Sequence, residues 1–277
     1  MTYKLIGDSC TDLTPEMLKN PHMVKVPLSI QVGPETILDD ENFDQGALLQ
    51  KMRAYPDAPK TACPSPSQYM EQFLAEGDNY VVTLSAPLSG SYNAAMQARA
   101  LYLEEHPDAH IHVFNSRSAS AGQVLIAQLV CQLAEHGLPF AQVVEQVEAF
   151  IDRMKLTFVL ENLENLRKNG RLTKVQCLVT GALRVKLLMG ATPEGEIEKL
   201  GQGLSTRQTL VRMVSRMAED PDHVGRRLAI AHCNCPDRAE YVRELAEKKC
   251  QFSEIFAVST GGISTVYAND GGIITAY

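Results

Sequence analysis

The sequence lacks a surplus of basic residues. It contains 26 Lys and Arg against 33 Asp and Glu, so its net charge is -7 and its pI is near 5.5. A nucleic-acid backbone is bound through clustered Lys and Arg, and no such stripe is present in the sequence. The composition therefore argues against a nucleic acid as a partner.

The sequence also lacks a pattern of cysteines that would stabilise a small fold through disulfide bonds. Its cysteines are an odd number and are scattered over positions 10, 63, 131, 177, 233, 235 and 250. The chain opens with "MTYKLIGDSC", which is not an apolar leader. We therefore expect a reduced, cytoplasmic protein without a disulfide framework.

Long apolar runs are missing as well. The most apolar helical stretch, "VLIAQLVCQLA" from Val124 to Ala134, is interrupted by Gln128 and Gln132. A membrane-spanning helix needs about 20 predominantly apolar residues. This stretch predicts a core helix, and no membrane span is expected.

The motifs of common catalytic and cofactor sites do not occur. There is no G-x-S-x-G elbow, and the histidines lie outside the hydroxyl-rich loops of the chain. "HCNC" (His232 to Cys235) has no second ligand pair at zinc-finger spacing, and "GQG" (Gly201 to Gly203) lacks the rest of a phosphate-binding loop. We predict no metal site and no cofactor.

What the chain does contain is an alternation of strand-like and helical runs. With 277 residues, 45% of them apolar, it can bury a large core and favours two domains. The first half has the pattern of a parallel sheet covered by helices on both faces. The predicted strands are Tyr3–Gly7, Val24–Val32, Tyr80–Leu84 and His110–Phe114. The predicted helices are Pro15–Lys19, Phe43–Arg53, Ser67–Glu76, Tyr92–Glu105, Gly122–His136 and Phe140–Met154.

The pattern changes near residue 155. Shorter strands and Gly-Gly turns follow, among them "RLAIAH", "EIFAVS" and "GGIITAY", with helices predicted near Thr206–Ala218 and Pro236–Lys248. These features predict a second domain of mixed α+β type.

Loops rich in hydroxyl side chains follow several predicted strands. They are "DSCTDL" (Asp8 to Leu13), "SAPLSGSYN" (Ser85 to Asn93), "NSRSASAG" (Asn115 to Gly122) and, before a helix, "TACPSPSQ" (Thr61 to Gln68). Ligands of α/β proteins lie beyond the carboxyl ends of the strands, and hydroxyls with free N–H groups at helix starts favour an anion such as a carboxylate. The competing interpretation is that these residues only form caps and turns.

Five segments of the chain form a specific combination: "DSCTDL", "TACPSP", "LSAPLSGSYNAA", "LENLRKNGRLTK" and "IAHCNCPDRAE". Together they resemble the DegV family of bacterial fatty-acid-binding, FakB-like proteins over nearly the whole chain. The resemblance implies a Rossmann-like parallel-sheet domain over residues 1–155, a smaller α/β domain with an antiparallel sheet over 156–277, and a lipid tunnel between them. It also implies a non-enzymatic carrier that binds a long-chain fatty acid such as palmitate and presents it to a fatty acid kinase.

The resemblance further implies which residues form the site. Those expected to bind the carboxylate are Thr61, Ser89, Ser91 and Asn93. Those expected near the head group or facing a partner are Arg171, Tyr267, Ser9 and Cys63. Tyr267 stands where the family usually has His, and Tyr is a weaker general acid or base at neutral pH. This position therefore bears on coupling to a kinase.

Two alternatives stay open from the sequence. The chain could be an acyl or phosphoryl hydrolase or transferase that uses Ser89 or Cys63 as nucleophile and His232 or Tyr267 as proton carrier, which requires one of these groups to meet a hydroxyl in space. Alternatively, the protein binds a lipid for storage or sensing without a kinase.

Overall fold

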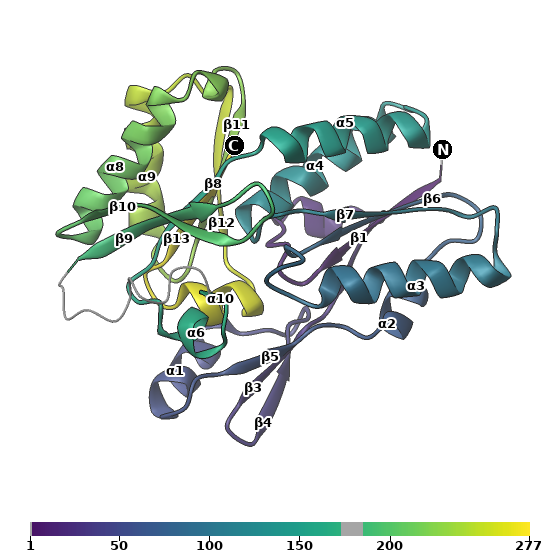
Figure 1. Ribbon diagram of the computed structural model, residues 1–277, viewed down its shortest axis with the longest axis horizontal. Coiled ribbons are helices and arrows are strands. Elements are labelled where there is room, and N and C mark those ends of the chain that lie inside the picture. Colours follow the sequence, from purple (N-terminus) through teal and green to yellow (C-terminus); the bar gives the residue numbers. More distant parts are fainter. Residues whose placement is uncertain (1, 173–184) are drawn as a thin grey trace.

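The computed structural model of the protein describes residues 2–172 and 185–277 and has an α/β fold (Figure 1). Three sheets make up the described part of the chain. Their strand orders are β2-β1-β6-β7, β4-β3-β5 and β10-β9-β8-β13-β11-β12.

The four-stranded sheet is parallel throughout, which confirms the sheet type predicted for the first half. Its strands are β1 (Tyr3–Asp8), β2 (Met23–Val26), β6 (Asp78–Thr83) and β7 (His110–Asn115). Successive side chains point to opposite faces, so Val81 packs on one face while Tyr80 and Val82 pack on the other. Both faces are buried, and the strands are therefore continuous apolar runs.

Helices cover both faces of this sheet (Figure 1). One face carries α2 (Pro66–Met70) and α3 (Ser91–Glu105), and the other carries α4 (Ala121–Glu135) and α5 (Phe140–Arg153). Two predicted helices are shorter than expected. Ser67–Glu76 is reduced to α2, and Pro15–Lys19 is reduced to the 3-10 turn η1 (Met17–Lys19), which ends at the predicted residue.

The prediction of one strand over Val24–Val32 is wrong, because this segment forms two strands that belong to different sheets. Pro27 has no N–H to donate, so the parallel pairing of β2 ends at Val26. The chain then enters a small antiparallel sheet that the sequence did not predict. This sheet consists of β3 (Ser29–Val32), β4 (Glu35–Leu38) and β5 (Lys60–Ala62), with α1 (Gln45–Ala54) between the last two strands.

The six-stranded sheet is antiparallel apart from the β11–β12 pair, which is parallel. Its strands are β8 (Leu156–Val159), β9 (Lys186–Ala191), β10 (Ile197–Gly203), β11 (Arg227–His232), β12 (Glu254–Ser259) and β13 (Ile273–Ala276). The helical elements of this part are α6 (Glu164–Lys168), α8 (Thr206–Glu219), η2 (Pro221–His223), α9 (Pro236–Lys249) and α10 (Gly262–Ala268).

Helix α4 joins the two large sheets. Its Val124 and Leu125 pack with the six-stranded sheet, whereas Ile126 and Val130 pack with the four-stranded sheet. A helix buried on two sides is apolar around most of its circumference, which explains the run predicted as a core helix. The predicted division near residue 155 falls between α5 and β8 and stays a prediction. In the described ranges, every helix is too short or too polar to cross a bilayer.

Candidate functional site

An apolar cavity lies between residues of the four-stranded sheet's loops and the six-stranded sheet. Its volume, taken as the space open to the centre of a water molecule, is about 80 Å³. Leu156, Phe158 and Leu160 line it from alternate positions, so they share one face of an extended segment. At about 3.3 Å per residue, the segment from Leu156 to Leu160 borders the cavity over about 13 Å. This segment therefore forms one wall of the cavity.

One end of the cavity carries hydroxyl groups. Thr61, on β5, and Tyr267, on α10, meet through their hydroxyl oxygens at 2.7 Å. Tyr267 also lines the cavity, so the hydroxyl pair lies at its boundary. The two residues are far apart in the sequence, and the antiparallel sheet that places Thr61 was not predicted.

Arg171 adds a cation at the same end. Gly170 before it adopts a positive φ of 75°, which glycine accepts without strain and which turns the chain toward Arg171. The Nε of Arg171 donates to the Leu88 carbonyl at 3.2 Å, and its guanidinium carbon lies 5.9 Å from the centre of the Tyr267 ring. Both Arg171 and Leu88 line the cavity. A cation held in this way favours an anion at this end.

Ser89 and Ser91 form a second hydroxyl pair at the start of α3. Their Oγ atoms are 3.0 Å apart, and the Ser91 N–H donates to the Ser89 Oγ at 3.2 Å. Gly90 is the N-cap of α3 and has no side chain to cap the helix, so the Ser89 hydroxyl accepts from the first N–H of the helix instead. The Cys63 sulfur lies against Gly90, and a Cβ added at Gly90 would be 2.8 Å from it. This contact brings the loop after Thr61 next to the loop of Ser89.

Of the expected residues, Arg171 and Tyr267 line the cavity, whereas Thr61, Ser89 and Ser91 lie outside its lining. Ser9 is fully buried, and its Oγ accepts a hydrogen bond from the Leu28 N–H at 3.0 Å. Asn93 is exposed on α3 and does not line the cavity. Cys63 is exposed beside Gly90 and is likewise not part of the lining.

Three buried carboxylates that sequence analysis did not single out support the site. Asp39 accepts from the N–H groups of Gly262 and Ile263 at 2.7 and 2.9 Å, and Asp12 accepts from the Gly261 N–H at 2.7 Å. Together they hold the start of α10, which carries Tyr267. A signal was present in the acidic turn "LDDENF", but solvated turns have the same composition.

The third carboxylate, Asp8, lies under the loop of Ser85. It accepts from the Leu84 N–H at 2.6 Å and from the Gln123 side chain at 2.9 Å. Burial raises the pKa of Asp8 from 3.8 to about 6, and hydrogen bonds from Leu84, Gln123 and Ser91 oppose this rise. Asp12 has its pKa raised to about 6 for the same reason, with hydrogen bonds from Ser120 and Gly261 opposing.

The geometry does not assemble a nucleophile and its base. The hydrogen bonds of the Ser89 side chain within the described residues run to Ser91, and no histidine bonds Ser89 or Cys63 there. The His232 Nδ1 is buried without a partner, and burial lowers the pKa of this imidazole. Across the described ranges, no group of three His, Cys, Asp or Glu side chains is arranged to hold a metal ion.

Comparison with known proteins shows relatives that match over the full length. A "DegV domain-containing protein" of Streptococcus gordonii is 34% identical, with 100% of this chain and 99% of the relative covered. The crystal structure of a DegV family protein from Ruminococcus gnavus, described with vaccenic acid, is 46% identical with a TM-score of 0.96, covering 100% of this chain and 99% of that one.

A second solved structure is the Streptococcus pneumoniae Fatty Acid Kinase (Fak) B3 protein loaded with linoleic acid. It is 34% identical with a TM-score of 0.92, and 100% of this chain and 99% of that chain are covered. The family model described as "Uncharacterised protein, DegV family" matches residues 2–276. This chain therefore belongs to the DegV family, which confirms the family resemblance of its motifs.

Proposed function

We propose that this protein binds a long-chain fatty acid, with the acyl chain in the apolar cavity and the carboxylate at the hydroxyl-lined end. The observation that carries the proposal is the chemistry of that cavity. Its lining is apolar along β8, while Arg171 and Tyr267 stand together at one end. Such a site suits a molecule with a long apolar tail and one acidic tip. The fatty acids named for the two solved relatives support this choice of ligand.

The energetics favour the tail as the source of affinity. Burying a methylene group gains about 0.8 kcal/mol, so a chain of about sixteen carbons gains on the order of 12 kcal/mol before the cost of association is deducted. Hydroxyl groups then hold the head group, at roughly 1.5–3 kcal/mol for each hydrogen bond to a charged oxygen. In this proposal Thr61 and Ser89 supply these bonds, and Arg171 stabilises the charge.

The protein is then a carrier and not an enzyme, and it presents the bound acid to a fatty acid kinase. The relationship to the Fak B3 protein supports the kinase as partner. In this scheme residues 1–155 and 156–277 are two domains with the lipid between them, and the cytoplasm is where the complex acts. The role of Ser91 is to orient Ser89, because the two hydroxyls are hydrogen-bonded.

The direct test is mass spectrometry of lipid extracted from the purified protein, followed by titration of the lipid-free protein with fatty acids. We expect long-chain fatty acids in the extract and saturable binding. The double change Thr61→Ala, Ser89→Ala should weaken binding about tenfold or more, because two hydrogen bonds to a charged oxygen are lost.

A matched control is the double change Thr36→Ala, Ser67→Ala, which removes two exposed hydroxyls outside the cavity lining. This variant should bind like the unaltered protein. An extract without fatty acid, together with no uptake on incubation, would overturn the proposal. Equal affinities of the two double variants would show that the head group lies elsewhere.

A further inference from the structure

A buried carboxyl group lies behind the hydroxyl pair of Ser89 and Ser91. Asp8 and Ser91 have no exposed surface. The Ser91 hydroxyl donates toward Asp8, and this interaction lowers the pKa of Asp8 against the effect of burial. The Ser91 Oγ also lies 3.0 Å from the Ser89 Oγ. Ser91 therefore links an inner acid to the hydroxyl that is proposed to hold the fatty-acid carboxylate.

The other contacts of Asp8 are donated by N–H groups. They come from the backbone of Leu84 and Cys10 at 2.6 and 3.2 Å and from the side chain of Gln123 at 2.9 Å. A backbone N–H can only donate, whereas a hydroxyl donates one hydrogen bond and accepts up to two. The Ser91 hydroxyl can therefore reverse its hydrogen bond when Asp8 gains or loses a proton.

Which of the two serines donates to the other depends on Asp8. The Ser89 Oγ already accepts from the Ser91 N–H at 3.2 Å, and each hydroxyl has a single proton. If Ser91 gives its proton to an ionised Asp8, Ser89 must donate to Ser91 and has only a lone pair left for a ligand. If a protonated Asp8 donates to Ser91, then Ser91 donates to Ser89, whose own proton is free. Only the second arrangement offers a donor to a carboxylate.

The groups around Asp8 are compatible with both arrangements. The titratable groups that face it are Cys10 beside it and Tyr69 on α2, and Asp12 acts on the Cys10 thiol as well. Burial raises the pKa of Cys10 and of Tyr69 well above the usual range, so both stay uncharged near neutral pH. Within the described ranges the buried Tyr69 hydroxyl has no hydrogen-bond partner at normal distance, although it faces Ser91. It can approach the Ser91 oxygen as a donor in either arrangement.

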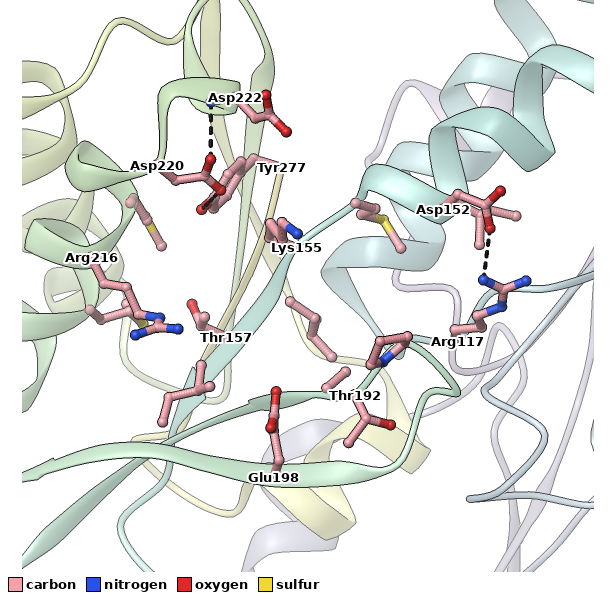
Figure 2. Close-up of a pocket in the computed structure, with 18 of the residues that line it drawn as sticks. Arg117, Asp152, Lys155, Thr157, Thr192, Glu198, Arg216, Asp220, Asp222 and Tyr277 are labelled. Carbon is pink, nitrogen blue, oxygen red and sulfur yellow. Dashed lines mark hydrogen bonds and ion pairs between the residues drawn. The ribbon is translucent and has the colours of Figure 1, made fainter.

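This group of residues is separate from the polar cleft of the molecule. Figure 2 shows that cleft, with Lys155, Arg216 and Asp222 around it. Asp8 and Ser91 do not line the cleft. A carboxylate of the cleft can therefore be changed without touching the contacts of Ser91.

We propose that Asp8 and Ser91 position the Ser89 hydroxyl as a donor to the fatty-acid carboxylate, and that Asp8 takes up a proton from water when the acid binds. This inference rests on the proposed function and adds two positioning residues to its site. The acid binds as its anion, the proton goes to a carboxyl oxygen of Asp8, and no covalent bond is made to the ligand. Burial gives Asp8 of the lipid-free protein a pKa of about 6, so the affinity should fall as pH rises above about 6.

The test is titration calorimetry of the lipid-free protein with palmitate at several pH values. From about pH 5.5 to about pH 8.5 we expect the affinity to fall about tenfold, because one hydrogen bond to a charged oxygen is lost. Near neutral pH the heat of binding should also depend on the ionisation enthalpy of the buffer, which reports proton uptake.

Two variants separate positioning from a structural role. Asp8→Asn keeps an N–H donor for Ser91 but does not titrate, so its affinity should stay near the low-pH value of the unaltered protein. Ser91→Ala keeps Asp8 and removes the link, so its affinity should lose the tenfold fall while its stability still depends on pH. The matched control is Asp222→Asn, at an exposed carboxylate of the cleft, which should bind with the pH profile of the unaltered protein.

The outcomes separate the two proposals. If the unaltered protein binds no palmitate at any pH, the proposed function fails. If it binds palmitate but its affinity does not fall with pH, the positioning role of Asp8 fails alone. A fall in Ser91→Ala as large as that in Asp222→Asn would also overturn the inference, because the titration of the ligand itself would then explain the profile.

Discussion

At position 267, where the family resemblance led us to expect His, the chain has Tyr. The Tyr267 hydroxyl lies 2.7 Å from the Thr61 hydroxyl. A phenol can donate one hydrogen bond and accept others, so it can orient Thr61 toward a carboxylate. We infer that the Tyr267 hydroxyl positions the Thr61 hydroxyl.

Replacing Tyr267 by Phe tests that role. The ring and its contact with Arg171 remain, while the Thr61 hydroxyl loses its partner. Removal of one buried hydrogen bond of this kind costs about 1 kcal/mol, so fatty-acid affinity should fall about fivefold. Titration calorimetry measures the change, and Tyr55→Phe, at an exposed tyrosine outside the cavity lining, is the control. Unaltered affinity in Tyr267→Phe would show that its hydroxyl does not act on the head group.

Helix α10 shows how an element too short to be stable alone is held in place. It spans only 7 residues, and its own N-cap, Gly261, provides no side-chain cap. Asp39, from the loop after β4, accepts from the Gly262 and Ile263 N–H groups instead. A carboxylate at a helix N-terminus also interacts favourably with the helix dipole. The small antiparallel sheet thus anchors the helix that lines the cavity.

Asp39→Ala should therefore destabilise both the fold and the site. Two N–H groups at the start of α10 would lose a charged acceptor, at a cost of roughly 2–3 kcal/mol in the free energy of unfolding. Urea denaturation measures this cost. Asp39→Asn keeps one acceptor oxygen and should lose less, and Asp57→Ala, at an exposed carboxylate, should lose almost nothing. Equal stability of Asp39→Ala and Asp57→Ala would contradict the anchoring role.

At the scale of the whole molecule, two buried acids give stability a distinctive pH dependence. Asp8, the last residue of β1, and Asp12, in the loop after it, are buried, and burial raises the pKa of each from 3.8 to about 6. In the folded protein these groups bind protons more tightly than in the unfolded chain. Their contribution to stability is thus largest below pH 3.8 and is lost as pH rises through about 6.

Asp12→Asn should remove part of this dependence, because Asn keeps an acceptor for the Gly261 N–H but does not titrate. The free energy of unfolding of the variant should fall less than that of the unaltered protein as pH rises from about 4 to about 7. The difference is at most about 3 kcal/mol, from a pKa shift of about two units. Urea denaturation across this range measures it. Parallel pH profiles of the two proteins would show that Asp12 has an ordinary pKa.

Local patterns in the sequence determined the class of fold and most of its regular elements. The spacing of apolar residues is set by the geometry of each element, so helix α5 and the parallel strands could be predicted from neighbouring residues alone. The hydroxyl-rich loops were also visible, although their composition did not separate ligand binding from capping.

Only the tertiary structure decided which of those groups meet. Thr61 and Tyr267 are brought together by the small antiparallel sheet, which begins after Pro27 ends the pairing of β2. The same sheet places Asp39 at the start of α10. Asn93, which belongs to the same motif as Ser89, instead faces solvent. The physical reason is that periodicity records only which face of an element is buried, whereas contacts between distant residues depend on how the sheets pack around α4.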